Sequence, residues 1–182
     1  MLKAADNPPI LTPDAETLTD LEGHWWVAHT KARNEKALAW DLLRRHIAHF
    51  LPMQEHVIFS GGRKRRSMMP LFASYLFFCG DETDRYTAMT TNRVCQTLDA
   101  FDQAGLIHDL AAIESALACK AGLEPYLHPA IGRRCRVAAG PFEGIEGVVV
   151  ERSRHARLVL EVGLLGQGAA MEIEADLLDP ID

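Results

Sequence analysis

Residues 70–78 read Pro70-Leu71-Phe72-Ala73-Ser74-Tyr75-Leu76-Phe77-Phe78, and this apolar segment decides the fold class of the chain. Its side chains predict a strand over residues 68–78, with Pro70 near the start, where a missing backbone N–H is tolerated. Successive side chains of a strand point to opposite faces, so Tyr75 and Phe77 share one face and Leu76 and Phe78 the other. One pair therefore belongs to the core, and the other is available to a partner.

Further elements follow on both sides of this strand. Aromatic and β-branched residues predict strands over residues 24–30, 54–60 and 94–98. Apolar residues at helical spacing predict helices over residues 34–50 and 106–120, and a short helix follows the turn at 80–84. Gly61-Gly62 begins a loop with four adjacent cations, Arg63, Lys64, Arg65 and Arg66. The order β-α-β-β-α-β-α predicts a mixed α/β domain over residues 23–121.

The two ends of the chain differ from this domain. Residues 1–22 combine prolines and acidic residues without an apolar period, which predicts a disordered leader. Residues 122–131 contain Gly122, Pro125 and Pro129, which predict a short stiff linker. Residues 132–182 are short apolar runs separated by glycines, which predict a small barrel of about five strands. The expected fold class is therefore α+β, with two domains.

Composition excludes several classes of protein. The chain has 182 residues, 48% of them hydrophobic, and a formal net charge of −6. This apolar content excludes a long disordered chain, and no apolar run approaches the roughly 20 residues of a membrane-spanning helix. The acidic balance argues against a protein that coats nucleic acid without specificity, because such binding neutralises phosphates. We expect a cytoplasmic monomer without membrane attachment.

The sequence contains no recognisable catalytic or metal-binding pattern. Residues 61–64 lack the first glycine and the Ser/Thr of a phosphate-binding loop, and no dinucleotide-binding or nucleophile-elbow motif occurs. The four cysteines are widely separated, which favours small apolar side chains in a reducing compartment over a zinc site. We therefore expect no enzyme activity, no catalytic residue, no cofactor and no metal.

Two segments carry a family resemblance. The passage Gly140-Pro141-Phe142-x-Gly144-x-x-Gly147-Val148-Val149 resembles the KOW motif of an SH3-like barrel. The passage Trp25-Trp26-Val27-x-His29-Thr30-Lys31-x-Arg33, together with residues 70–77, resembles the N-terminal domain of NusG. That domain usually reads P-L-F-P-G-Y-L-F-V, so Ala73-Ser74 replace Pro-Gly here. The resemblance covers residues 24–182 and is closest to specialised paralogues such as RfaH.

The resemblance implies a set of binding residues. Polymerase contact is expected from Tyr75 and Phe77, with Phe72 and Trp25, although the alternative that all four are core residues stays open. Nucleic-acid contact is expected from six cations, which otherwise belong to solvated surface: Lys31, Arg33, Arg63, Lys64, Arg65 and Arg66. A partner of the KOW barrel is expected at Phe142, which alternatively caps the open end of the barrel.

The resemblance also implies a function. A factor of this type binds the clamp helices of RNA polymerase, suppresses pausing or termination, and touches the non-template DNA. Its KOW domain recruits Rho or a small-subunit ribosomal protein. Two alternatives remain: a housekeeping NusG that promotes Rho-dependent termination, and a ribosome-associated KOW protein that binds RNA. The acidic charge counts against the second alternative, because ribosomal RNA binders normally need a basic excess.

Overall fold

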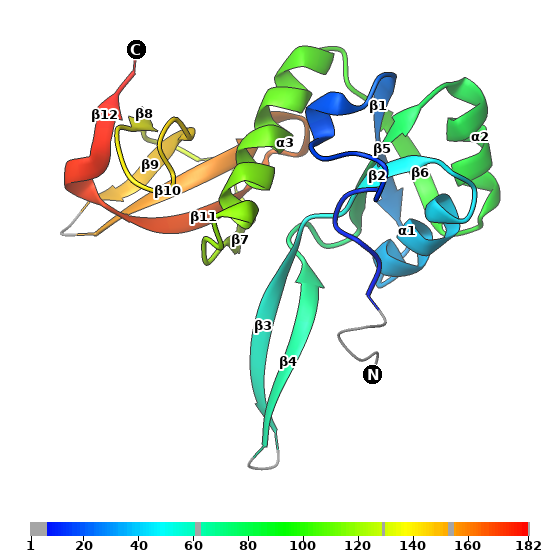
Figure 1. The fold of residues 1–182 in the computed structure, drawn as a ribbon, viewed down its shortest axis with the longest axis horizontal. Helices are drawn as coiled ribbons and strands as arrows, with labels where there is room; N and C mark the ends of the chain where they lie inside the picture. Colours follow the sequence, from blue (N-terminus) through cyan, green and yellow to red (C-terminus); the bar gives the residue numbers. More distant parts are fainter. Residues whose placement is uncertain (1–6, 61–62, 129, 153–154, 182) are drawn as a thin grey trace. The chain divides into compact units, whose positions relative to one another are not determined.

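Strand β5 (Tyr75–Gly80) lies inside a four-stranded antiparallel sheet of order β2-β5-β1-β6 in the computed structural model. The structure describes residues 7–60, 63–128, 130–152 and 155–181. The described chain divides into two units, Met1–Gln103 and Ala104–Asp182. Figure 1 labels their elements. The elements of the first unit are β1 (His24–Thr30), α1 (Glu35–Leu43), β2 (Ala48–Phe50), β3 (Met53–Ser60), β4 (Arg63–Pro70), β5, α2 (Glu82–Thr90) and β6 (Val94–Asp99), with a 3-10 turn at Leu18–Asp20.

The sheet of the first unit is apolar on both faces. On one face, Leu76 and Phe78 pack with Leu38 and Leu42 of α1 in a single core cluster. On the other face, Phe77 contacts the rings of Phe50 and Phe72, with centroid separations of 6.4 and 5.9 Å. Because both faces are apolar, the four central residues of β5 are buried.

The second unit holds α3 (Gln103–Ala118, whose first residue closes the first unit) and a six-stranded sheet. The sheet has the order β12-β8-β9-β10-β11-β7. Its strands are β7 (Glu124–Tyr126), β8 (Arg133–Val137), β9 (Glu146–Arg152), β10 (His155–Val162), β11 (Gln167–Glu174) and β12 (Leu178–Pro180). The α+β fold class, with an all-β C-terminal segment, is confirmed.

The helix predicted over residues 34–50 is shorter than expected. It ends at Leu43, and His46 adopts a left-handed φ of 57° that a helix cannot contain. The backbone N–H of Ile47 then donates to the carbonyl of Leu42, which closes the helix end. Residues 48–50 form β2, where Phe50 pairs with Phe77. Pairing with the sheet therefore overrides the helical spacing of the apolar residues.

The predicted strand over residues 68–78 is two strands. β4 ends at Pro70, and β5 begins at Tyr75 after a turn in which Ser74 has a φ of 66°. The backbone N–H of Ser74 donates to the Glu35 carboxylate at 2.6 Å, which holds the turn against α1. The predicted basic loop is also a strand, because residues 63–66 form the first half of β4 and pair with β3.

The described part of the leader, residues 7–22, is ordered against the first unit. Leu18 is fully buried, Leu11 forms a bridge with Phe50, and the N–H of Thr12 donates to the carbonyl of His49 at 3.0 Å. Three apolar residues, Ile10, Leu11 and Leu18, supply contacts that the proline-rich composition obscures. Residues 1–6 lie outside the described residues.

The linker and the domain boundary also differ from the prediction. Part of the segment predicted as a linker, β7, pairs with β11 at Gly168 to Ala170. The boundary between the two units falls after Gln103, whereas the sequence predicts it after residue 121. Five strands, β8 to β12, lie in the predicted barrel segment, and β7 is the sixth.

Candidate functional site

The β3–β4 hairpin, residues 53–70, is a two-stranded sheet of its own within the first unit. Its root is fixed: Met53 and Leu71 are buried, and the N–H of Leu71 donates to the carbonyl of Pro52 at 2.9 Å. The Lys36 ammonium of α1 donates to the Met68 carbonyl, and burial lowers the pKa of this lysine. Beyond this root the two strands pair only with each other, and Figure 1 shows them extending as an arm.

Antiparallel register sorts the side chains of the arm onto two faces. Val57 lies opposite Arg66, and Phe59 lies opposite Lys64, so these four residues share one face. Phe59 is 75% exposed and Val57 is 37% exposed. Arg66 forms an exposed ion pair with Glu55 at 3.6 Å, which contributes at most about 1 kcal/mol. We call this set of four residues, Val57, Phe59, Lys64 and Arg66, the hairpin face.

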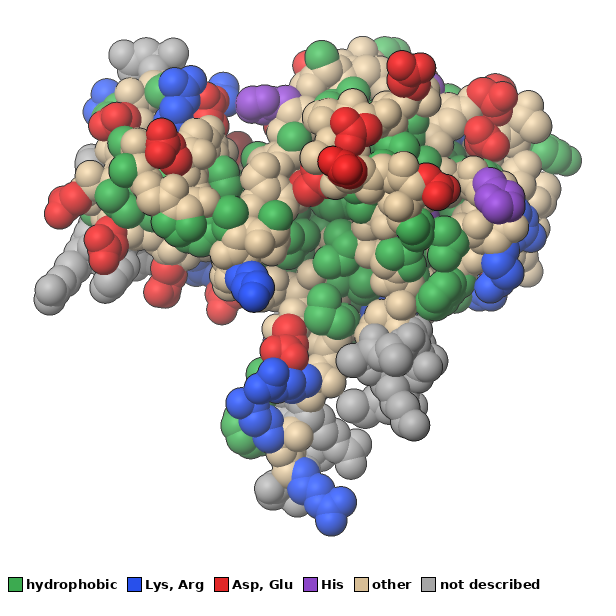
Figure 2. Space-filling view, in the orientation of Figure 1, with side chains coloured by type: hydrophobic (Ala, Val, Ile, Leu, Met, Phe, Trp, Pro, Cys, Tyr) green, Lys and Arg blue, Asp and Glu red, His purple; other side chains and the backbone are tan. Residues whose placement is uncertain are grey.

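The predicted cations of residues 63–66 therefore occupy both sides of β4. Arg63, Lys64 and Arg66 are exposed, and the side chain of Arg65 lies outside the described part of the chain. Figure 2 shows Lys and Arg side chains gathered on the arm. Residues 53–70 hold four cations and one glutamate, in a chain of net charge −6. The hairpin is thus locally basic and attracts an anionic partner.

The other two predicted cations lie where β1 leads into α1. Lys31 and Arg33 are exposed, and the Lys31 ammonium donates to the Asn92 side-chain oxygen at 2.8 Å. Arg33 has a left-handed φ of 61° in this turn. They belong to a different segment from the hairpin cations and lie outside its two-stranded sheet.

The predicted polymerase-binding aromatics differ in exposure. Trp25 and Phe77 are fully buried, and Phe72 is 1% exposed. Tyr75 alone is partly exposed, and its ring stacks on His29 with a centroid separation of 5.1 Å. Trp25, Phe72 and Phe77 are thus core residues, as the alternative interpretation holds. Tyr75 exposes part of its ring.

The Gly-Pro-Phe turn has the backbone that its glycines predict. Gly140 and Gly144 have φ values of 91° and 86°, which glycine adopts without strain. Phe142 is partly buried, and its carbonyl accepts the N–H of Ile145 at 3.1 Å. The Cys119 thiol at the end of α3 lies 2.9 Å from the Pro141 carbonyl. The turn therefore offers only part of the Phe142 ring to a partner.

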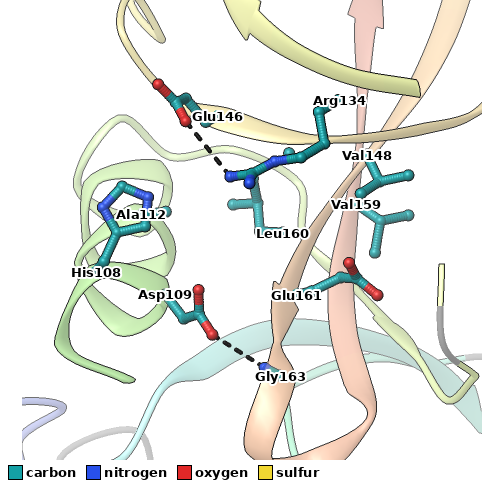
Figure 3. A pocket seen from close by; sticks show the side chains of 11 residues that line it. His108, Asp109, Ala112, Arg134, Glu146, Val148, Val159, Leu160, Glu161 and Gly163 are labelled. Atoms are coloured by element: carbon teal, nitrogen blue, oxygen red, sulfur yellow. Dashed lines mark hydrogen bonds and ion pairs between the residues drawn. The ribbon is translucent and has the colours of Figure 1, made fainter. Parts of the chain in front are cut away.

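A pocket of about 220 Å³ lies within the second unit, between α3 and the sheet. Figure 3 shows Asp109 accepting the backbone N–H of Gly163, at 3.0 Å, and Arg134 paired with Glu146 at 3.6 Å. Burial raises the pKa of Asp109, and hydrogen bonding to Arg136 lowers the pKa of Glu146. These contacts satisfy the charged lining, and the described residues contain no group of ligands able to hold a metal ion.

A surface cluster on β1, α2 and β6 pairs its charged side chains with one another. The Arg85 guanidinium lies 5.2 Å from the Trp26 ring and donates to Glu82 at 2.8 Å and to Thr97 at 3.1 Å. His24 contacts Asp99 at 2.7 Å. The charged side chains of this cluster are thus paired with one another, whereas the hairpin face exposes Phe59 beside Lys64.

Sequence reasoning missed Phe59 and Val57 as surface residues. Both lie in a predicted strand, where apolar residues usually belong to a core. The signal that identifies them is the pairing of β3 with a strand of four cations, because such a strand cannot be buried.

The comparisons with known proteins agree with this fold. Residues 23–109 match the family model described as transcription termination factor nusG. A solved structure titled "Domain interaction in Thermotoga maritima NusG" is similar to the chain at 15% identity, with a TM-score of 0.50. The match covers 88% of this chain and 98% of that one. No curated protein matches the chain. None of the helices in the described ranges is long and apolar enough to cross a membrane.

Proposed function

Because this chain belongs to the NusG family of transcription factors, we propose that it is an elongation and antitermination factor that binds the clamp helices of RNA polymerase. The observation that carries the proposal is the family match over residues 23–109, which include the whole four-stranded sheet. The factor would bind one conformation of the polymerase more tightly than the others. This difference in binding free energy would disfavour the paused state.

We place the polymerase contact at Tyr75. Its ring is partly exposed beside His29, whereas Phe77, Phe72 and Trp25 are buried and position the strand that carries it. A partly exposed tyrosine supplies apolar contact area and a hydroxyl group, which suits a protein interface. Removal of this ring should weaken polymerase binding, while removal of a buried ring should first destabilise the unit.

The exposed cations support a contact with the non-template DNA. Lys31, Arg33 and the hairpin cations carry positive charge on an acidic chain, so their contribution to binding should fall with salt. Phe142 supports a contact between the KOW barrel and a second partner, either Rho or a small-subunit ribosomal protein. These two contacts would link the bound polymerase to the non-template DNA and to Rho or a small-subunit ribosomal protein.

A second candidate function is promotion of Rho-dependent termination. The description of the matching family model, transcription termination factor nusG, favours it. Single-round transcription by purified polymerase, with and without this protein and with and without Rho, separates the two candidates. Longer transcripts in the presence of Rho support antitermination, and shorter ones support the termination factor. An unchanged transcript pattern under all four conditions would overturn both.

A further inference from the structure

β2 is an edge strand of the four-stranded sheet, and residues 7–12 lie along its outer side (Figure 1). Leu11 forms an antiparallel bridge with Phe50. Two backbone hydrogen bonds flank this bridge: from the N–H of Thr12 to the carbonyl of His49 at 3.0 Å, and from the N–H of Leu51 to the carbonyl of Ile10 at 2.6 Å. We call residues 7–12 the N-terminal strap. It pairs backbone groups that an edge strand otherwise leaves open.

The side chain of His49 holds the N-terminal strap from inside the first unit. It is fully buried, and its Nε2–H donates to the Pro9 carbonyl at 3.3 Å, because a carbonyl only accepts. His49 lies opposite Phe78, which belongs to the apolar cluster formed with α1. The Nδ1 atom of His49 is buried and has no hydrogen-bond partner among the described residues. A proton on Nδ1 would therefore place a charge in an apolar environment.

The described elements around His49 supply no counter-charge for such a proton. The N-terminal strap contains no charged residue, and β5 contains no acidic or basic residue. Burial raises the pKa of the Cys79 thiol to about 11, so this group of β5 is neutral. The charged residues of α1 each have another partner: Glu35 the N–H of Ser74, Lys36 the side chain of Asn7, and Asp41 the side chain of Arg93. Burial therefore lowers the pKa of His49, and the Pro9 and Ile47 carbonyls offset this only in part.

We propose that the N-terminal strap is a releasable edge strand, held closed by the neutral imidazole of His49 and freed when that imidazole takes up a proton. Release is the least costly response to the proton, because it breaks few hydrogen bonds while β5 and α1 stay packed in the core. The His49 carbonyl and the Leu51 N–H would then lie unpaired along β2, as a template for an extended segment of another chain. The N-terminal strap precedes the family match over residues 23–109, so this switch is an addition to the matched domain and does not depend on polymerase binding.

A proton favours release because the imidazole is protonated more readily in water than in the core. An exposed histidine has a pKa of about 6.5, and burial beneath the N-terminal strap lowers the pKa of His49. The released state therefore binds the proton at a higher pH than the closed state does. The equilibrium constant for release should rise as pH falls below about 6.5, by at most about tenfold per pH unit.

Amide hydrogen exchange of the full chain, followed by NMR from about pH 7.5 to about pH 5.5 and corrected for intrinsic rates, measures the release. The amides of Thr12 and Leu51 report on the N-terminal strap, and the amide of Leu38, which donates to the Asn34 carbonyl at 2.8 Å, reports on α1. Thr12 and Leu51 should be less protected than Leu38 at every pH, and their protection should fall below about pH 6.5. Equal protection at all three amides would mean that the strap opens only when the whole unit unfolds, and would overturn the inference.

Asn7→Ala removes the hydrogen bond between the N-terminal strap and Lys36 and leaves His49 in place. It should lower the protection of Thr12 and Leu51 about fivefold at neutral pH, as expected for the loss of one hydrogen bond. Because binding and release are linked, it should also move the NMR titration of the His49 ring upward, toward about 6.5. A His49 titration that Asn7→Ala leaves unchanged would show that the proton does not release the strap.

His49→Gln keeps a side-chain N–H and removes the titrating group. In this variant the protection of Thr12 and Leu51 should no longer fall below about pH 6.5, and a fall that persists would contradict the assignment of the switch to His49. His56→Gln is the matched control, because His56 is an exposed histidine of β3 outside the N-terminal strap. It should leave the protection of both amides and the titration of His49 as they are in the unaltered chain.

Discussion

Replacement of Phe77 by alanine should strongly destabilise the first unit, whereas replacement of Tyr75 should not. Phe77 is fully buried and contacts Phe50 of β2 and Phe72 of the turn before β5, so its removal leaves a cavity beside these two rings. Truncation of a buried phenylalanine costs ~3–5 kcal/mol, against a total stability of ~5–15 kcal/mol for an ordinary domain. For a unit of this size the melting temperature should fall by roughly 15–30 °C.

The expected effect of Tyr75→Ala is small by comparison. Its partly exposed ring loses one stacking contact with His29, which is worth ~0.5–1.5 kcal/mol. Urea titration of each variant, followed by tryptophan fluorescence, measures the two losses. Core polymerase pull-down at a temperature where Tyr75→Ala remains folded then measures binding. Phe77→Leu serves as the control, because it keeps most of the buried volume and should cost less than about 1.5 kcal/mol.

Either of two results would contradict these roles of Phe77 and Tyr75. Phe77→Ala with an unchanged urea midpoint would mean that the ring is not a core residue. Tyr75→Ala with full polymerase binding would remove the proposed contact from β5. The two variants thus distinguish Phe77, which stabilises the sheet, from Tyr75, which lies on its surface.

Three further changes test other parts of the fold. Ser74→Gly should raise stability by about 0.5–1 kcal/mol, because glycine relieves the φ of 66° at this turn; a lower urea midpoint would contradict this. His49 is buried, and burial lowers its pKa, so its imidazole is protonated at a lower pH in the folded state than in the unfolded state. Stability should therefore fall as pH drops through about 6.5, with a smaller slope in His49→Gln; identical slopes in calorimetry would count against it. Asp41 is 7% exposed and pairs with Arg93 and with two arginines at the end of its own helix. Asp41→Ala should therefore lower the free energy of unfolding by about 3 kcal/mol in urea titration. A loss under about 0.5 kcal/mol would show that these ion pairs are dispensable.

Much of the fold follows from local sequence patterns. The strand at residues 24–30 is confirmed as β1, and the helix predicted over residues 106–120 is confirmed as α3, although it begins at Gln103. In α3 the apolar period matches the buried face, and in β1 the aromatic and β-branched residues are those that a buried strand prefers. Pattern reasoning succeeds there because local preference and tertiary packing agree.

The errors occur where a tertiary contact decides the outcome. Ile47 and Phe50 continue the helical spacing of α1, but the helix ends at Leu43 and pairing with Phe77 places Phe50 in β2. Leu18 is fully buried although its neighbours are threonines and an aspartate. The pairing of Phe50 with Phe77 has no local signature, because the two residues lie 27 positions apart in the chain.

The candidate site, like the fold, follows only in part from local sequence. The sequence identifies the hairpin cations by their density, but the face that each occupies depends on the register of β3 against β4. A shift of one residue would move Lys64 and Arg66 to the opposite side of the arm and separate them from Phe59. The aromatic segment at β5 likewise predicts a functional strand, and burial then assigns Tyr75 and Phe77 to different roles.

Single-round transcription through a strong pause site, by core polymerase with and without the full chain, tests the central proposal most directly. The unaltered chain should shorten the pause, and Tyr75→Ala, at a temperature where it is folded, should lose this effect. A pause lifetime that the unaltered chain leaves unchanged, under conditions where it is folded and in excess, would contradict the account.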